Sequence, residues 1–303
     1  MTARQSYYEA NARQRLAGVL DPASLREFTP PAARLTSPHL PRLGLPVAFD
    51  DGIVVGRGRL DGRAVLAAAQ EGGFMGGAVG EVHGAKLTGL LERALDERPA
   101  AVLLLLESGG VRLHEANAGL IGVSEAMRAL LAARAGGVPV IGLVGATFGC
   151  FGGIGLLAAC CDRILISEEG RLGMSGPEVI ETAHGADEFD SRDRALVWRT
   201  VGGKHRYLLG DAQQLVEDDI GAFRQAAIAA LAAPDLPRFG LDDLVARQAA
   251  LGERLARFGD CADATDIWRA AGDPDPAGLP LLERDAFLAR TEPIRLPRTR
   301  SVR

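Results

Sequence analysis

The sequence predicts an α/β fold built around a mostly parallel, buried β-sheet. Between residues 84 and 169, apolar runs of strand length alternate with segments of helical periodicity. The strand-like runs carry almost no charge, as in strands buried on both faces. Glycine-rich stretches follow several of these runs, where the backbone must turn sharply or let another group come close. Together these observations are typical of βα units around a parallel sheet.

The sequence patterns of the first 70 residues indicate two other kinds of structure. Residues 1 to 45 are polar and then rich in proline, which indicates a helix followed by an extended arm. From residue 47 to residue 70, apolar pairs alternate with Asp-Gly turns. This second pattern predicts a β-meander.

The elements of the core follow in order. Leucines recur at helical spacing from Leu87 to Leu95, and Pro99 ends this helix. We then expect a strand, a helix, a strand, a helix and a strand over residues 101–108, 119–137, 138–145, 152–161 and 163–169.

The chain becomes helical and charged beyond residue 186, with helical periodicity over residues 211–233 and 241–259. We therefore expect three parts. They are an N-terminal helix and extended arm over 1–45, a core over 46–220, and a helical extension and tail over 221–303.

Composition limits the classes of function. The net charge of -5 argues against a nucleic-acid binder, which needs a basic face. No apolar run reaches the roughly 18 residues of a membrane span, and the chain does not open with an apolar targeting segment. The four cysteines form no CxxC pair and no histidine pair has metal-ligand spacing, which predicts buried thiols and no zinc. We expect a cytoplasmic protein without a membrane or nucleic-acid partner.

Three glycine clusters mark the places where chemistry is expected: residues 71–84, 107–112 and 145–155. None matches the nucleotide-binding or phosphate-loop patterns, and "GMSGP" lacks the last glycine of a serine-hydrolase elbow. The second and third clusters each follow a strand and lead toward a helix, where backbone N–H groups are unpaired.

These two clusters predict an oxyanion hole. We expect the N–H groups of Gly109, Gly110, Gly152 and Gly153 to bind ligand oxygens, as reactions through a thioester enolate require. The alternative is that the glycines only allow tight packing of strands against helices.

The glycine clusters also carry a family resemblance. The segments "GGFMGGAVGEVHG", "SGGVRLHEANAG" and "GATFGCFGGIGLLAACCDRILISEEGRLGMSGPEVIE" resemble the carboxyltransferase branch of the crotonase superfamily. Within that branch, residues 188–211 and "SGGVRLHEANAG" are most similar to beta subunits of biotin-independent malonate decarboxylases. The resemblance covers about residues 45 to 220. It implies a crotonase/ClpP-like spiral of ββα units, with a helical C-terminal extension.

The resemblance implies an activity and partners. A malonyl thioester on an acyl carrier protein with a CoA-like prosthetic arm loses CO2 through an enolate and becomes an acetyl thioester. This chain then binds no cofactor, biotin or zinc of its own. Its partners are a homologous gamma subunit facing the site, the acyl carrier protein and an acyl-carrier transferase (alpha) subunit.

The alternative within the same branch is the carboxyltransferase beta subunit of a biotin-dependent acyl-CoA carboxylase. Bacterial acetyl-CoA carboxylase subunits of this kind carry a four-cysteine zinc ribbon at the N-terminus. Residues 1 to 149 contain no cysteine, which weakens this alternative.

Several side chains are candidates for the site. Arg112 is expected to hold the malonyl carboxylate or a neighbouring carboxylate of the fold, and the alternative is a bridge to Glu107 or Glu115. His114 could protonate the enolate carbon, because imidazole exchanges protons near neutral pH, and His83 has a weaker case. We expect the substrate pocket to be formed by Phe74, Met75, Gly76, Gly77, Ser108, Ser175, Gly176 and Pro177.

The densest basic stretch is expected to contact the carrier. We predict that Arg199, Lys204 and Arg206 meet acidic groups of the carrier protein or phosphates of its arm. The alternative is a solvated helix face with Asp190 and Asp193 as partners.

Overall fold

The computed structural model describes residues 4–233 and 239–297. In this part of the chain a seven-stranded sheet has its strands in sequence order. The first three strands pair antiparallel and the remaining pairs are parallel. The strands are β1 (Arg26–Glu27), β2 (Ile53–Leu60), β3 (Arg63–Gln70), β4 (Ala101–Leu106), β5 (Val140–Val144), β6 (Arg163–Ser167) and β7 (Gln214–Val216).

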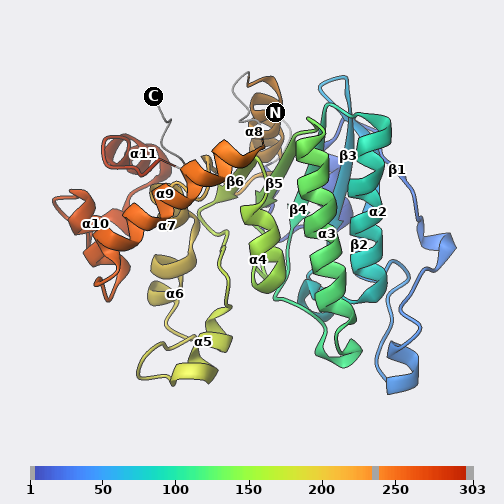
Figure 1. Ribbon diagram of the computed structural model, residues 1–303, viewed down its shortest axis with the longest axis horizontal. Helices are drawn as coiled ribbons and strands as arrows, with labels where there is room; N and C mark the ends of the chain where they lie inside the picture. Colours follow the sequence, from blue (N-terminus) through green and yellow to red (C-terminus); the bar gives the residue numbers. More distant parts are fainter. Residues whose placement is uncertain (1–3, 234–238, 298–303) are drawn as a thin grey trace.

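Helices cover both faces of this sheet. The helices α2 (Glu81–Glu97), α3 (Ala118–Ala135) and α4 (Gly152–Ala159) lie side by side over one face (Figure 1). The other face is packed against α1 (Ala12–Val19) and α8 (Ile220–Ala232). All six residues of β4 are buried because helices lie on both sides of it. The predicted parallel, buried sheet is confirmed.

The order of the strands brings the glycine-rich loops to one edge of the sheet. Each parallel strand pairs with the next one in sequence, and the connecting helices α2, α3 and α4 share one face. The chain therefore winds as a spiral, and the carboxyl ends of β3, β4, β5 and β6 lie along one edge of the sheet. The three glycine clusters occupy the loops at this edge.

The remaining helices lie beyond β6. They are α5 (Pro177–His184), α6 (Arg194–Val201), α7 (Gly203–Leu208), α9 (Leu241–Phe258), α10 (Ala264–Ala271) and α11 (Arg284–Thr291). Short 3-10 turns are η1 (Pro31–Ala33), η2 (Leu40–Leu43), η3 (Met75–Gly77), η4 (Leu113–Glu115) and η5 (Leu279–Leu281).

One predicted helix is partly wrong. Helical periodicity over residues 211–233 predicted a single helix, but β7 occupies residues 214–216 and α8 begins only at Ile220. Leu215 and Val216 pair with β6 on the side that β5 leaves unpaired. This long-range pairing outweighs the local helical pattern.

No helix within residues 4–233 and 239–297 is both long and apolar enough to cross a membrane. In the same ranges, no group of three or more His, Cys, Asp or Glu side chains is placed to hold a metal ion. Of the four cysteines, Cys150 and Cys161 are buried and Cys160 and Cys261 are half-buried.

Candidate active site

The glycine loops that follow β3, β4 and β5 meet at the carboxyl edge of the sheet. Val79 bridges to Val111, and Ser108 bridges to Cys150. A Cβ atom on Gly152 would lie 3.0 Å from the Cα atom of Gly110. The β4 turn (residues 107–112) and the β5 turn (residues 145–153) are therefore in direct backbone contact.

The amides of the β4 turn already have acceptors inside the protein. The Gly109 N–H donates to the carbonyl of Gly76 at 2.9 Å. The Gly110 N–H donates to the Ser108 hydroxyl at 3.1 Å, and that hydroxyl donates back to the Gly110 carbonyl at 3.0 Å. The expectation that both amides face a ligand oxygen needs correction, because their hydrogen bonds fix the shape of the turn instead.

The amides of the β5 turn differ. The Gly152 N–H donates to the Met174 carbonyl at 2.9 Å, so this predicted donor is also occupied. No described residue accepts a hydrogen bond from the N–H of Gly153 or of Ile154 in the first turn of α4. These amides point along the helix axis with the positive end of its dipole behind them. Gly153 is therefore the predicted donor that stays available to a ligand.

Gly153 also lets two helices approach closely. A Cβ atom at this position would lie 2.6 Å from Cγ1 of Val123 on α3. Tight packing, one of the two roles considered for these glycines, therefore applies to Gly153, and its role toward a ligand stays a prediction.

A buried ion pair lies beneath the two turns. Glu107 accepts hydrogen bonds from the N–H groups of Gly72 at 3.1 Å and Phe148 at 3.3 Å, and thereby connects the loops after β3 and β5. The Arg15 guanidinium on α1 donates to the same carboxylate and, at 2.9 Å, to the carbonyl of Gln70. Arg15 is fully buried. Sequence reasoning missed Arg15, because nothing local links it to a carboxylate 92 positions away.

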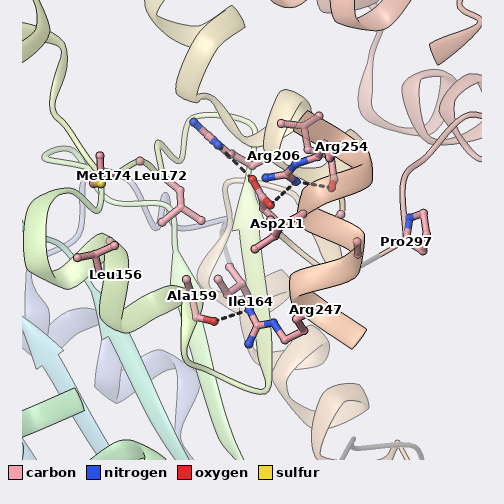
Figure 2. Close-up of a pocket in the computed structure, with 16 residues that line it drawn as sticks. Leu156, Ala159, Ile164, Leu172, Met174, Arg206, Asp211, Arg247, Arg254 and Pro297 are labelled. Carbon is pink, nitrogen blue, oxygen red and sulfur yellow. Dashed lines mark hydrogen bonds and ion pairs between the residues drawn. The ribbon is translucent and has the colours of Figure 1, made fainter. Parts of the chain in front are cut away.

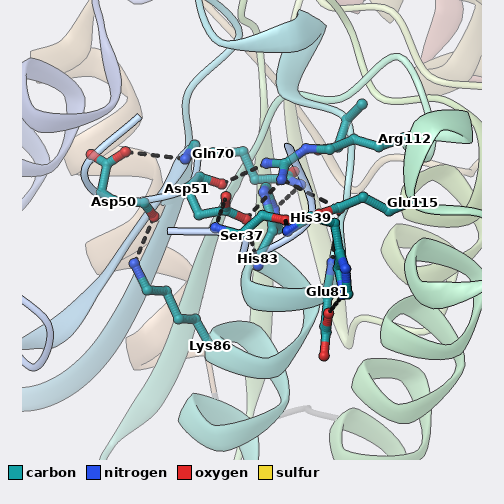
Figure 3. A network of polar contacts seen from close by, with 12 residues as sticks. Ser37, His39, Asp50, Asp51, Gln70, Glu81, His83, Lys86, Arg112 and Glu115 are labelled. Atoms are coloured by element: carbon teal, nitrogen blue, oxygen red, sulfur yellow. Dashed lines mark hydrogen bonds and ion pairs between the residues drawn. The ribbon is translucent and has the colours of Figure 1, made fainter. Parts of the chain in front are cut away.

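Arg112 is committed to the fold. Its Nη1 donates to Asp51 Oδ2 at 2.8 Å, its Nη2 to the Asp51 carbonyl at 2.7 Å, and its Nε to the Ala78 carbonyl at 3.0 Å. Glu115 lies 3.5 Å away (Figure 3), and the Arg112 side chain has no exposed surface. The expected contact with the substrate carboxylate is therefore corrected. Arg112 binds neighbouring carboxylates and fixes the end of the β4 turn.

The two candidate histidines have opposite surroundings. His83 is completely buried, and burial, with the nearby Arg112 charge adding to it, lowers its pKa to about 3. It stays neutral at physiological pH and has no path to a substrate. His114 lies in η4 with its side chain exposed to solvent. Of the two, only His114 is accessible for a proton transfer.

The predicted pocket residues gather around the turns. The Phe74 ring lies 5.0 Å from the Arg112 guanidinium. A Cβ atom on Gly77 would lie 2.0 Å from the Glu107 carbonyl, so only glycine fits there. The segment Ser175–Pro177 follows Met174, whose carbonyl accepts from Gly152, and it opens α5. The Met75–Gly76 turn and Ser108 complete this group through the contacts of the Gly109 and Gly110 amides.

The basic stretch contacts the C-terminal part of the chain. Arg199 pairs with Asp263 at 2.9 Å, and Arg206 pairs with Asp211 at 3.1 Å. Lys204 donates to Glu168 at 2.6 Å and, at 2.8 and 2.6 Å, to the carbonyls of Pro280 and Leu282. Each of Arg199, Lys204 and Arg206 has an intramolecular acceptor, and the expected contact with a carrier stays a prediction. The alternative partners, Asp190 and Asp193, are not the residues that hold them.

Comparison with known proteins places this arrangement in a family. Residues 9–226 match the carboxyl transferase domain. The chain belongs to the carboxyl transferase domain family. It is 41% identical over 307 residues to the malonyl-S-ACP:biotin-protein carboxyltransferase of Malonomonas rubra, which covers 95% of this chain and 96% of that relative.

Solved structures of carboxyl transferase relatives share the fold. A Pseudomonas malonate decarboxylase hetero-tetramer in complex with malonate has a chain that superposes with a TM-score of 0.80 and 40% identity. The match covers 88% of this chain and 98% of that one. A Pseudomonas malonate decarboxylase hetero-dimer gives a TM-score of 0.66 and 36% identity over 85% of this chain and 97% of that one. The predicted crotonase-like fold is confirmed.

An apolar surface surrounds the turns of this carboxyl transferase chain. Leu113 is 83% exposed, Met174 69%, and Phe148 on the β5 turn 44%. Val179, near the start of α5, is also exposed. Apolar side chains grouped around a site in this way are typical of a surface that another protein covers.

Proposed function

We propose that this chain is the beta subunit of a malonate decarboxylase and converts a malonyl thioester on an acyl carrier protein into the acetyl thioester and CO2. The free Gly153 N–H, beside the tightly fixed β4 turn, is the observation that carries this proposal. The similarity along nearly the whole chain to proteins that act on malonyl groups supports the choice of substrate.

Decarboxylation of a malonyl thioester depends more on stabilising the negative thioester oxygen of the enolate than on a strong acid or base. When the bond between the carboxylate and the central carbon breaks, CO2 leaves and the electron pair passes into the enolate of the thioester. Its negative charge collects on the thioester oxygen, and we place the half-buried Gly153 amide as its donor. An oriented donor of this kind is worth about 3–4 kcal/mol in the transition state. A proton then adds to the carbon, and His114 is our candidate donor.

The site is completed by another subunit. The apolar surface around the turns is where we place a homologous gamma subunit, and the relatives of known structure are described as hetero-oligomers. The acyl carrier protein delivers the substrate on its CoA-like arm, and an acyl-carrier transferase subunit loads it. We place the complex in the cytoplasm.

A second candidate function is transfer of the carboxyl group to a biotin protein. The relative from Malonomonas rubra is described as a carboxyltransferase with a biotin protein as acceptor, which favours this candidate. We place this chain with the direct decarboxylases and expect no biotin requirement.

One reconstitution tests both candidates. The chain is purified alone and together with the gamma subunit, supplied with malonyl-loaded carrier protein, and acetyl carrier protein is measured by mass spectrometry. We expect turnover by the complex that avidin does not reduce, and slow turnover by the isolated chain. Inhibition by avidin would assign the carboxyltransferase function. Full turnover by the isolated chain would refute the shared site.

A further inference from the structure

A crevice between α4 and α9 combines apolar walls with clustered arginines. Its volume is about 260 Å³. Leu156 on α4 and Leu172 form part of its apolar wall (Figure 2). Leu251 on α9 also lines it. Arg206, Arg247 and Arg254 line the same space. This combination is typical of a site for a small molecule with a charged end.

The arginines of the crevice outnumber the carboxylate that faces them. Asp211 accepts from Arg206 at 3.1 Å and from Arg254 at 2.8 Å, so one carboxylate lies between two guanidinium groups. Burial acts to raise the pKa of Asp211, but the Arg206 and Arg254 charges outweigh it and the pKa lies below its usual value. The Nε of Arg206 is buried without a hydrogen-bond partner. The described lining residues therefore leave an excess of positive charge.

The orientation of α9 contributes to this charge. A surface helix normally turns its apolar side toward the core. In α9, Leu241 and Leu255 are more than 70% exposed, while Arg247 and Arg254 are half-buried and line the crevice. Arg247 donates to the Ala159 carbonyl at the end of α4 at 2.9 Å, and this contact holds its guanidinium over the crevice.

The crevice begins next to the glycine turns. Met174 lines it, and the Met174 carbonyl is the acceptor for the Gly152 N–H. Ala159, the contact of Arg247, lies six residues along α4 from Gly153, a rise of about 9 Å. A malonyl thioester held at Gly153 is too short for its carboxylate to reach Arg247. A separate anion, or one at the far end of a long arm, can reach it.

We propose that this crevice binds a phosphate or carboxylate group carried on a short apolar or amide chain. A crevice volume of about 260 Å³ suits a short chain rather than a large ligand. Two sources supply this chemistry. One is the phosphate-bearing end of the carrier's prosthetic arm, and this source rests on the proposed function. The other is a free short-chain acid, which does not.

Calorimetric titration of the full chain tests the proposal and separates the two sources. The probes are pantetheine 4′-phosphate, uncharged pantetheine and hexanoate. We expect one of the two anions to bind at least about tenfold more tightly than pantetheine. Arg247→Gln should weaken that binding about ten- to a hundredfold, because a charged hydrogen bond is lost. Arg128→Gln, which changes an exposed arginine on α3, should leave it unchanged.

Arg247→Gln also removes the contact between α9 and Ala159, and a second variant controls for a resulting shift of α9. Leu251→Trp fills the crevice and keeps every charge, so it should also weaken anion binding by tenfold or more. Tighter binding of the phosphate assigns the arm, and tighter binding of hexanoate assigns a free acid. The proposal is overturned if neither anion binds, if pantetheine binds equally well, or if Arg247→Gln and Arg128→Gln behave alike. Because no turnover is measured, the result is independent of whether the chain decarboxylates malonyl groups.

Discussion

The β4 turn and the β5 turn look alike in sequence and perform different tasks. Each follows a buried strand and carries two adjacent glycines. In the β4 turn both glycine amides are bonded within the protein, and charged pairs fix the backbone from below. In the β5 turn the second glycine begins a helix and keeps its N–H available. A glycine pair therefore permits close approach, but the element that follows decides whether an amide is presented.

The support beneath the β4 turn is where we expect the largest effect. Glu107→Gln leaves the buried Arg15 charge without a carboxylate, which should cost about 3–5 kcal/mol of unfolding free energy. Urea unfolding measures this loss. The double variant Arg15→Met, Glu107→Gln removes both charges and should regain much of the stability. If Glu107→Gln were as stable as the parent, the ion pair would not anchor the turn.

Removing one amide should have a smaller and purely catalytic effect. Gly153→Pro deletes the N–H, and proline is tolerated in the first turn of a helix. The parent for this test is Val123→Ala, which makes room for the added atoms. We expect kcat of the complex to fall about 10²–10³-fold.

Gly153→Ala in the same parent is the matched control for this change, because it adds a Cβ atom and keeps the amide. Its kcat should stay close to that of the parent. Equal losses for the proline and alanine variants would show that the Gly153 amide is no donor and that only packing matters at this turn.

The expected effect that is smallest at neutral pH concerns stability to acid. The unfolded chain binds a proton at His83 as pH falls through about 6.5, whereas folded His83 stays neutral until its pKa of about 3. Stability should therefore fall on acidification within this window, by up to about 1.4 kcal/mol per pH unit for this histidine. His83→Gln should flatten the dependence measured by urea unfolding between pH 6.5 and 4. His184→Gln, at an exposed site, should not, and an equal change in both variants would contradict the assignment.

The strands, the helices of the core and the convergence of the glycine loops could be predicted from sequence, because each depends on local periodicity. The acceptors of the turn amides could not, since the Gly76 and Met174 carbonyls reach them from other loops. The prediction for Arg112 was wrong for a related reason. Its position in the motif placed it near a ligand, but its buried guanidinium binds the carboxylate of Asp51, which lies 61 positions away in sequence.

Lys204 has a consequence for how the last helices unfold. Two of its three acceptors are the Pro280 and Leu282 carbonyls, which lie between α10 and α11. If these helices separate from α7, the ammonium group loses both carbonyls while it is still largely enclosed by protein, which is unfavourable. Opening of α10 and α11 therefore carries an energetic cost at α7. We expect these helices to unfold as one cooperative unit rather than one after another.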